Sequence, residues 1–202
     1  MAVWTAKIIS TACRLSGRQG VTLAGKIALK MDPGILRDLS SQVRKKIFVV
    51  CGTNGKTTTN NLLCSAIESE GKKIVCNHTG SNMLAGVAAA FVLSAKNNGK
   101  LDADYACIEI DEASTLRIFP HFKPDYMILT NLFRDQLDRY GEIDITMKLL
   151  SQAIEMAPDM KLIVNGDDAL SVYLAMESHN DYVTYGITEQ VFKEQDSREI
   201  RE

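Results

Sequence analysis

The sequence lacks several features that would assign it to a broad class of proteins. Its formal net charge is −2, so its overall charge does not favour nucleic acid as a partner. Its five cysteines include no C-x-x-C pair, which predicts reduced thiols, a cytoplasmic protein and no zinc site within these residues. No apolar run is long enough to cross a bilayer, and residues 1–16 lack the charged-then-apolar order of a signal peptide. These absences leave a cytoplasmic globular domain, for which 46% hydrophobic residues supply a core.

The segment 47–58 is the most informative stretch of the chain. A β-branched run ends in Gly52-Thr53-Asn54-Gly55-Lys56-Thr57-Thr58, and a helical pattern follows at once. The glycines allow backbone N–H groups to converge on an anion, and the start of a helix adds unpaired N–H donors. The usual G-x-x-x-x-G-K-[ST] motif has glycine where Val50 stands, so the match is to the shorter variant G-T-N-G-K-T. We therefore expect residues 52–58 to contact a nucleotide, with Lys56 on the β- and γ-phosphates and Thr57 on Mg²⁺.

Hydrophobic periodicity predicts strands and helices that alternate along the chain. Strands are expected over 47–51, 73–76, 105–110, 126–130, 161–164 and 182–185. Helices are expected over 2–16, 33–42, 57–70, 84–96 and 144–157, with another after 165–168. This alternation is typical of an α/β fold with a doubly wound, mainly parallel sheet, here preceded by an N-terminal helical arm.

Two of the predicted helices have an apolar face that we expect to be packed. On the helix over 2–16 this face consists of Trp4, Ile8, Ala12 and Leu15. Binding of that helix to a membrane surface is the alternative, but its polar face carries few cations. On the helix over 57–70 the inward residues are expected to be Leu62, Leu63, Ala66 and Ile67.

Polar clusters follow the predicted strands at their carboxyl ends, which is where ligands bind in sheets of this kind. Glu109 ends a strand that should lie near the glycine-rich loop, so we expect it to hold Mg²⁺ together with Thr57. The alternative is that Glu109 caps the next helix. Alternation along the strand places Asp111 on the same side as Glu109, and Glu112 on the opposite side or in the turn.

Other polar residues at the same edge are weaker candidates. His78, Ser81 and Asn82 lie in the polar loop 77–82 and could contact a substrate or form hydrogen bonds within the loop. The remaining carboxylates at this edge could serve the site or merely cap helices; these are Asp135, Asp138, Asp167 and Asp168.

These motifs resemble those of the Mur ligase family. The resemblance rests on Gly52-Thr53-Asn54-Gly55-Lys56-Thr57-Thr58, on Glu109-Ile110-Asp111-Glu112-Ala113, on Thr130-Asn131-Leu132 with 134–138, and on Val164-Asn165-Gly166-Asp167-Asp168. Within the family the chain resembles the MurT-like proteins through the stretches 25–30, 79–84 and 133–139. The resemblance covers residues 47 to about 170 and implies the central ATP-binding domain, with Asn131 as a further nucleotide contact.

The resemblance also implies an activity, that of an ATP-dependent carbon–nitrogen ligase in peptidoglycan biosynthesis. MurT-like proteins activate the α-carboxylate of D-glutamate in the lipid II stem peptide as an acyl phosphate. Ammonia from a glutaminase partner of the GatD type then yields D-isoglutamine. The resemblance therefore implies ATP and Mg²⁺, a heterodimer with the glutaminase, and work on membrane-anchored lipid II at the inner face of the membrane.

The chain departs from the family pattern at three points. Gln136 stands where the ordinary Mur ligases carry a histidine that contacts metal, so a second metal is not expected. Lys148 is out of register with their carbamylated lysine. MurT-like proteins continue with an inserted zinc ribbon and a C-terminal domain that carries a catalytic aspartate, which would lie beyond residue 202. Zinc is expected only in that part.

The expected organisation follows from these points. Residues 1–45 form the N-terminal arm and linker, residues 46–188 the ATP-binding domain, and residues 189–202 a charged tail where the insertion would start. A fragment with this organisation is expected to be inactive alone.

Three other functions remain open at this point. A folylpolyglutamate synthase-like ligase would resemble G-T-N-G-K-G-S, from which Thr57-Thr58 departs. A P-loop kinase needs a base for the acceptor hydroxyl, and a GTPase needs a guanine-reading motif; the sequence shows neither convincingly. A non-catalytic nucleotide-binding module that holds a partner belongs to a different class. Glutamine-dependent amidation in the presence of a glutaminase separates the enzyme from such a module.

Overall fold

A computed structural model of the chain describes residues 1–15, 20–78, 81–133 and 142–187. Its centre is a six-stranded sheet in the order β2-β3-β1-β4-β5-β6, and every neighbouring pair is parallel. The strands in that order are β2 (Ile74–Cys76), β3 (Tyr105–Glu109), β1 (Lys46–Cys51), β4 (Tyr126–Leu129), β5 (Lys161–Asn165) and β6 (Tyr182–Tyr185). The predicted α/β fold with a doubly wound parallel sheet is therefore confirmed.

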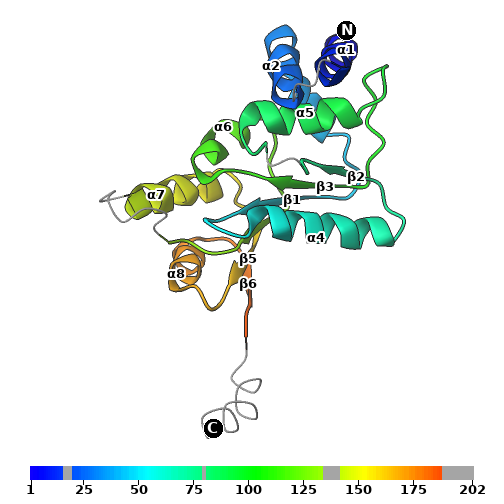
Figure 1. Cartoon of the computed structure of the whole chain (residues 1–202). Helices are drawn as coiled ribbons and strands as arrows, with labels where there is room; N and C mark the ends of the chain where they lie inside the picture. The colour runs from blue at the N-terminus through cyan, green and yellow to red at the C-terminus, as the bar shows by residue number, and fades with distance from the viewer. Residues whose placement is uncertain (16–19, 79–80, 134–141, 188–202) are drawn as a thin grey trace, which may run out of the picture.

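Helices cover both faces of this sheet. In chain order they are α1 (Ala2–Leu15), α2 (Val21–Met31), α3 (Ile35–Ser40), α4 (Lys56–Ser69), α5 (Leu84–Ser94), the 3₁₀ turn η1 (Glu112–Ser114) with α6 (Thr115–Ile118), α7 (Glu142–Glu155) and α8 (Ala169–Glu177). Figure 1 shows α4 and α5 on opposite sides of β1 and β3, with α1 and α2 stacked beyond α5. None of the helices in the described ranges is long and apolar enough to cross a membrane.

The second half of the central strand β1 is fully buried, and the strand ends at the carboxyl edge of the sheet. Val49, Val50 and Cys51 are fully buried, as expected for a strand covered on both faces. Each of these side chains contributes roughly 1.5–3 kcal/mol of burial free energy if it resembles an ordinary core aliphatic residue. Strand β1 ends at Cys51, and the chain continues into the loop 52–58 at the carboxyl edge of the sheet.

The predicted packing face of α1 is wrong. Trp4, Ile8 and Leu15 are exposed, and so is Ala12. The buried side chains of α1 are instead Val3, Ala6 and Ser10. Small residues decide the geometry of these helices, because a Cβ on Gly25 of α2 would lie 1.7 Å from the carbonyl oxygen of Ala85 in α5. Such close approach selects the small-residue face of each helix rather than the face with the largest apolar side chains.

Helix α4 is also rotated from its predicted orientation. Leu62 is 67% exposed and Ala66 is exposed, whereas Leu63 and Ile67 are partly buried as expected. The fully inward positions are Asn60 and Cys64. The buried face therefore follows positions 60, 63, 64 and 67, which is the usual helical spacing but includes a polar residue that hydrophobic periodicity cannot identify.

Candidate functional site

The loop between β1 and α4 is tightly tied to the end of β4. Gly52 has φ +127°, and a Cβ there would lie 2.2 Å from Thr130 Oγ1, so only glycine fits. Thr53 N donates to Asn131 O at 2.7 Å, and Asn54 N donates to Asn131 Oδ1 at 2.9 Å. The segment that follows β4 thus fixes the path of the loop, and Asn131 holds it through both its backbone and its side chain.

The start of α4 presents a group of backbone donors. The first intrahelical bond runs from Thr59 N to Gly55 O at 2.9 Å. Within the part of the chain that the structure describes, no protein acceptor takes the N–H groups of Gly55, Lys56, Thr57 and Thr58. Gly55 has φ +82°, and among the described residues, its two chain neighbours aside, no atom lies within 4 Å of the position of its missing Cβ. This open space beside unpaired donors, at the positive end of a 14-residue helix, suits an anion such as a phosphate group.

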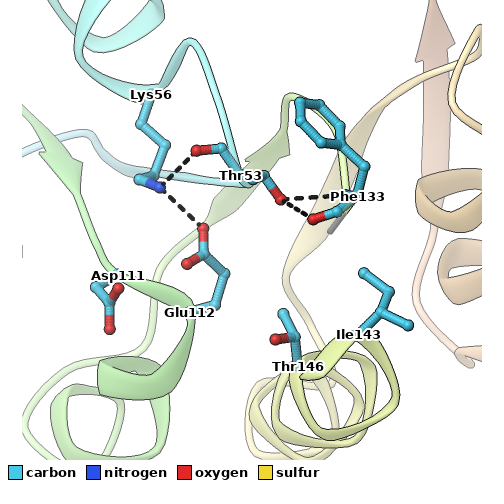
Figure 2. A pocket seen from close by; sticks show the side chains of 7 residues that line it. All are labelled: Thr53, Lys56, Asp111, Glu112, Phe133, Ile143 and Thr146. Carbon is cyan, nitrogen blue, oxygen red and sulfur yellow. Dashed lines mark hydrogen bonds and ion pairs between the residues drawn. The ribbon is translucent and has the colours of Figure 1, made fainter. Parts of the chain in front are cut away.

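Lys56 lies over the same loop and faces an acidic residue. Its Nζ donates to Gly52 O at 2.5 Å. It also donates to Thr53 O at 3.2 Å and to Glu112 Oε1 at 3.2 Å (Figure 2). Glu112 Oε1 also accepts from Gly52 N at 2.8 Å. The sequence placed Glu112 opposite Glu109 or in the turn and gave it no role. Its contact with Lys56 depends on η1, which follows β3 and was not predicted.

Glu109 is buried at the end of β3 with neutral partners. Its side chain accepts from Thr57 Oγ1 at 2.7 Å through Oε2 and from Asn82 Nδ2 at 3.2 Å through Oε1. The residue is 3% exposed, and among the described residues no lysine, arginine or histidine forms an ion pair with it. A buried carboxylate needs compensation for lost hydration, and a bound cation supplies it. The carboxylate and hydroxyl oxygens are also the ligand types that Mg²⁺ prefers.

Asn77 fixes the position of Glu109 through its backbone. Asn77 Oδ1 accepts from Glu109 N at 2.8 Å, and Asn77 Nδ2 donates to Glu109 O at 2.8 Å and to Ser81 O at 3.1 Å. The side chain of Asn77 is buried, so these bonds hold β3 and the loop after β2 in register. Asn77 was not among the predicted site residues.

A pocket of about 130 Å³ opens beside the loop. It is lined by Thr53, Lys56, Asp111, Glu112, Phe133, Ile143 and Thr146 (Figure 2). Thr53 Oγ1 accepts from Phe133 N at 3.1 Å and donates to Phe133 O at 3.2 Å, which closes one wall. Burial raises the pKa of the neighbouring Cys51 thiol well above its usual value, so this residue adds no charge behind the loop.

The three candidate residues of the loop 77–82 have different partners, and only one of them contacts Glu109. Asn82 contacts Glu109, as described above. Ser81 Oγ lies 3.1 Å from Thr22 Oγ1 on α2, and His78 Nδ1 lies 3.1 Å from Asn61 Oδ1 on α4. In this structure Ser81 and His78 therefore bond to neighbouring helices.

Of the remaining candidates, Asp168 caps a helix, Asp167 bonds to the backbone after β6, and the others lie outside the described ranges. Asp168 caps α8 by accepting from Ser171 N at 3.0 Å, and it also accepts from Leu132 N at 3.0 Å. Asp167 Oδ2 accepts from Ile187 N at 2.9 Å. Asp135, Gln136 and Asp138 lie outside the described residues, as does the tail 189–202.

Comparison with known proteins identifies a matching family and a similar relative. The Mur ligase middle domain matches residues 50–201. The lipid II isoglutaminyl synthase (glutamine-hydrolyzing) subunit MurT of Staphylococcus aureus (strain COL) is 40% identical over 186 residues. That match covers 92% of this chain and 41% of the relative, so the chain spans well under half of the relative's length.

Solved structures share the fold at lower identity. MurF ligase from Thermotoga maritima in complex with ADP has a TM-score of 0.63 at 16% identity, covering 77% of this chain and 36% of that one. The bifunctional folylpolyglutamate synthase/dihydrofolate synthase of Yersinia pestis c092, complexed with AMPPNP and Mn ion, has a TM-score of 0.55 at 16% identity. It covers 78% of this chain and 49% of that one. At these identities the likeness concerns the fold alone.

Proposed function

Because the chain belongs to the Mur ligase family, we propose that it forms the nucleotide-binding part of an ATP-dependent amide ligase of peptidoglycan biosynthesis. The observation that carries this proposal is the cradle at the start of α4, where four N–H groups have no protein acceptor among the described residues and lie beside the ammonium group of Lys56. A phosphate chain is the ligand that such donors recognise. In this proposal residues 52–58 and Asn131 form the ATP site, within a domain that comprises residues 46–188.

Thr57 and Glu109 are proposed to hold the divalent cation, which we take to be Mg²⁺. The proposal is supported by their 2.7 Å contact and by the burial of Glu109 without a cationic partner among the described residues. Held by these two residues, a divalent cation would supply positive charge to stabilise the transferring phosphoryl group. Asn82 orients the second carboxylate oxygen of Glu109, and Asn77 fixes the backbone behind it.

The Lys56–Glu112 pair has to rearrange when phosphate arrives. Both side chains are 15% exposed, so their attraction is stronger than that of a surface pair. An incoming phosphate offers Lys56 an acceptor of higher charge than one carboxylate, and Lys56 exchanges Glu112 for it. Glu112 keeps its bond to Gly52 N and continues to hold the loop.

The reaction that fits this site is the activation of a carboxylate by phosphoryl transfer. The substrate's carboxylate oxygen forms a bond to the γ-phosphorus as the bond to ADP breaks, which gives an acyl phosphate and ADP. Ammonia then attacks the acyl carbon, phosphate leaves and the lost proton passes to solvent, so that an amide remains. The name of the 40% identical relative supports the α-carboxylate of D-glutamate in lipid II as the acceptor and glutamine as the nitrogen source. A GatD-like glutaminase partner and action at the inner face of the membrane belong to the same proposal.

An amidation assay tests this proposal. Because these 202 residues are expected to be inactive alone, they are tested as part of a full-length MurT-like chain, which is combined with a glutaminase, glutamine, ATP, Mg²⁺ and lipid II. The stem peptide is then analysed by mass spectrometry for conversion of D-glutamate to D-isoglutamine. Ammonium chloride should replace glutamine and glutaminase, and Lys56→Ala should abolish the product. Lys72→Ala, which removes an exposed lysine beyond the other end of α4, is the matched control and should retain the activity.

Two outcomes would separate this function from its alternatives. Binding of ATP without amide formation under either nitrogen source would indicate a nucleotide-binding module that serves a partner. Formation of an amide to an amino acid instead of ammonia would indicate another ligase of the same family.

A further inference from the structure

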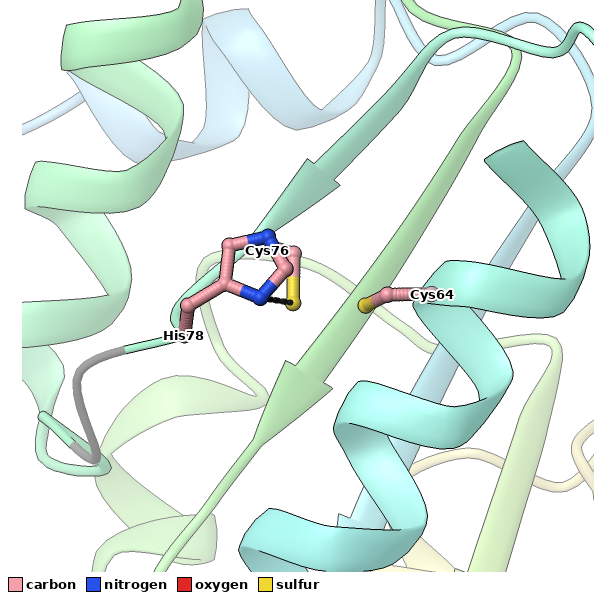
Figure 3. A group of neighbouring side chains, drawn as sticks. All are labelled: Cys64, Cys76 and His78. Atoms are coloured by element: carbon pink, nitrogen blue, oxygen red, sulfur yellow. Dashed lines mark hydrogen bonds between the residues drawn. The ribbon is translucent and has the colours of Figure 1, made fainter. Parts of the chain in front are cut away.

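Three side chains with metal-binding atoms meet on the α4 side of the sheet, away from the loop 52–58. They are Cys64 in α4, Cys76 at the end of β2 and His78 two residues later (Figure 3). One ligand atom of each lies within 4.8 Å of the others. The sequence gave no sign of this group, because its members are separated by 12 and 2 positions and none belongs to a C-x-x-C pair.

The spacing of these atoms suits a tetrahedral metal. Cys76 Sγ and His78 Nδ1 are 3.5 Å apart. Zinc bonds of about 2.3 Å to sulfur and about 2.0–2.1 Å to nitrogen place two such ligands about 3.5–3.6 Å apart at a tetrahedral angle. Two thiolates and an imidazole are also the ligand types that select zinc over Mg²⁺ or Ca²⁺.

The surroundings of the group support its sulfur atoms and provide access. Asn60 Nδ2 donates to Cys76 Sγ at 3.3 Å, a contact that orients the sulfur and stabilises a thiolate. Cys64 is buried, Cys76 is partly buried and His78 is exposed, so an ion can enter from the His78 side. His78 Nδ1 also lies 3.1 Å from Asn61 Oδ1, and metal binding requires the tautomer with the proton on Nε2 and exchange of this contact for the ion.

We propose that Cys64, Cys76 and His78 bind a Zn²⁺ ion, with a water molecule as the fourth ligand on the exposed side. The ion links α4, which begins at Lys56 and Thr57, to the segment after β2 that carries Asn77 and Asn82. Because those asparagines hold Glu109, zinc would stiffen the connection between the two elements that meet at the candidate magnesium site. This proposal does not depend on the proposed function.

Cobalt(II) spectroscopy tests the site directly on the 202-residue chain. Protein stripped with a chelator under a phosphine reductant is titrated with Co²⁺, and Zn²⁺ affinity is then measured by competition with a chromophoric chelator. We expect one equivalent of Co²⁺ to give thiolate-to-cobalt charge-transfer absorption and tetrahedral d–d bands, which Zn²⁺ removes. The thiol protons must leave on binding, so the affinity should fall as the pH is lowered.

Four variants, two in the proposed ligands and two controls, test whether these residues bind the metal. His78→Ala removes an exposed ligand without emptying the core and should weaken Zn²⁺ binding at least about 100-fold, since even outer-shell partners cost 10- to 100-fold. Cys76→Ser should reduce the charge-transfer absorption. Cys107→Ser is the matched control: Cys107 is buried opposite Cys76 in the sheet and contacts Cys64, but does not belong to the group. That variant and Glu109→Gln should both bind as the parent does.

Several results would overturn the proposal. One is a titration without charge-transfer absorption, and another is Zn²⁺ affinity that His78→Ala leaves unchanged. A Cys64–Cys76 disulfide that forms in air in the presence of Zn²⁺ would also overturn it, because bound thiolates are protected from that reaction.

Discussion

Thr57 Oγ1 donates a 2.7 Å hydrogen bond to Glu109 Oε2, although the two residues are 52 positions apart. Thr57 belongs to the first turn of α4 and Glu109 to the end of β3, so the bond joins the helix to the strand next to β1 at the carboxyl edge of the sheet. Both oxygens are hard ligands, and the carboxylate is buried. In the proposed mechanism Thr57 and Glu109 would hold the metal ion through these two oxygens.

The left-handed conformation of Gly55 leads to a prediction with an internal control. Gly55→Ala should destabilise the fold by about 1–2 kcal/mol, because a Cβ strains a residue at φ +82°. It should also weaken ATP binding at least about tenfold, or ~1.4 kcal/mol, since the new methyl group enters the cradle and shifts the N–H donors. Gly99→Ala shares the strain at φ +78° in open space but lies in the turn after α5. Chemical denaturation should give similar losses for both variants, and calorimetry a binding loss for Gly55→Ala only. Equal ATP affinities in the two variants would contradict the assignment of the cradle.

The contact between Glu112 and Lys56 predicts that removing the charge of Glu112 raises the affinity for ATP. Glu112→Gln keeps an oxygen that can accept from Gly52 N but removes the charge that competes with phosphate for Lys56. ATP affinity should rise by about fivefold, which corresponds to ~1 kcal/mol for a partly buried ion pair. Asp111→Asn removes a charge from the same pocket without altering a contact of Lys56 seen in the structure, so its effect should be smaller. A loss of affinity in Glu112→Gln, measured by calorimetry, would show that Glu112 supports binding instead of competing with it.

An ion-pair cluster at the opposite edge of the sheet predicts part of the pH dependence of stability. Hydrogen bonds from Lys73 and then Arg44 lower the pKa of Asp102, and the backbone N–H of Lys73 and then Arg44 lower that of Asp104. A carboxylate whose pKa is lower in the folded state stabilises the fold above its unfolded pKa of about 3.9, and this contribution is lost as the pH falls below that value. The melting temperature of Asp102→Asn should therefore fall less steeply than that of the parent below about pH 4. Asp159→Asn, which removes an exposed carboxylate that forms no ion pair in the described structure, should keep the parent's slope. Parallel curves for all three proteins would show that the cluster contributes nothing to acid stability.

Most of the fold could be predicted from the sequence because the strands are short runs rich in apolar and β-branched residues, separated by clear helical patterns. The predicted strands agree with the observed ones to within one residue at each end, and β6 agrees completely. The segment of α2 was not predicted as a helix, because Gly25 interrupts its helix-favouring sequence. The packing of α2 depends on a close contact between Gly25 and Ala85, which has no sequence signal. The predicted buried faces of α1 and α4 were wrong in whole or in part for a related reason. Small and polar residues pack at positions where hydrophobic periodicity predicts large apolar ones.

The site was predictable where its residues follow strands and not where they depend on local turns. The loop 52–58 and Glu109 stand directly after β1 or at the end of β3, so the parallel topology alone brings them to one edge. Glu112 reaches Lys56 only through the 3₁₀ turn, and the pairing of Cys64 with Cys76 depends on the rotation of α4. Neither the turn nor the rotation has a distinct sequence signal.

Calorimetric titration of ATP, with and without Mg²⁺, shows whether the loop 52–58 is the nucleotide site. The parent chain is compared with Lys56→Ala, Glu109→Gln and the control Lys72→Ala. We expect Mg²⁺-dependent binding by the parent and the control. Affinity should fall about 10- to 100-fold in Lys56→Ala, as expected for one charge-assisted hydrogen bond of ~1.5–3 kcal/mol. In Glu109→Gln the dependence on Mg²⁺ should disappear. Equal, tight binding by all four proteins would contradict the account, because the nucleotide would then occupy a site other than the loop 52–58.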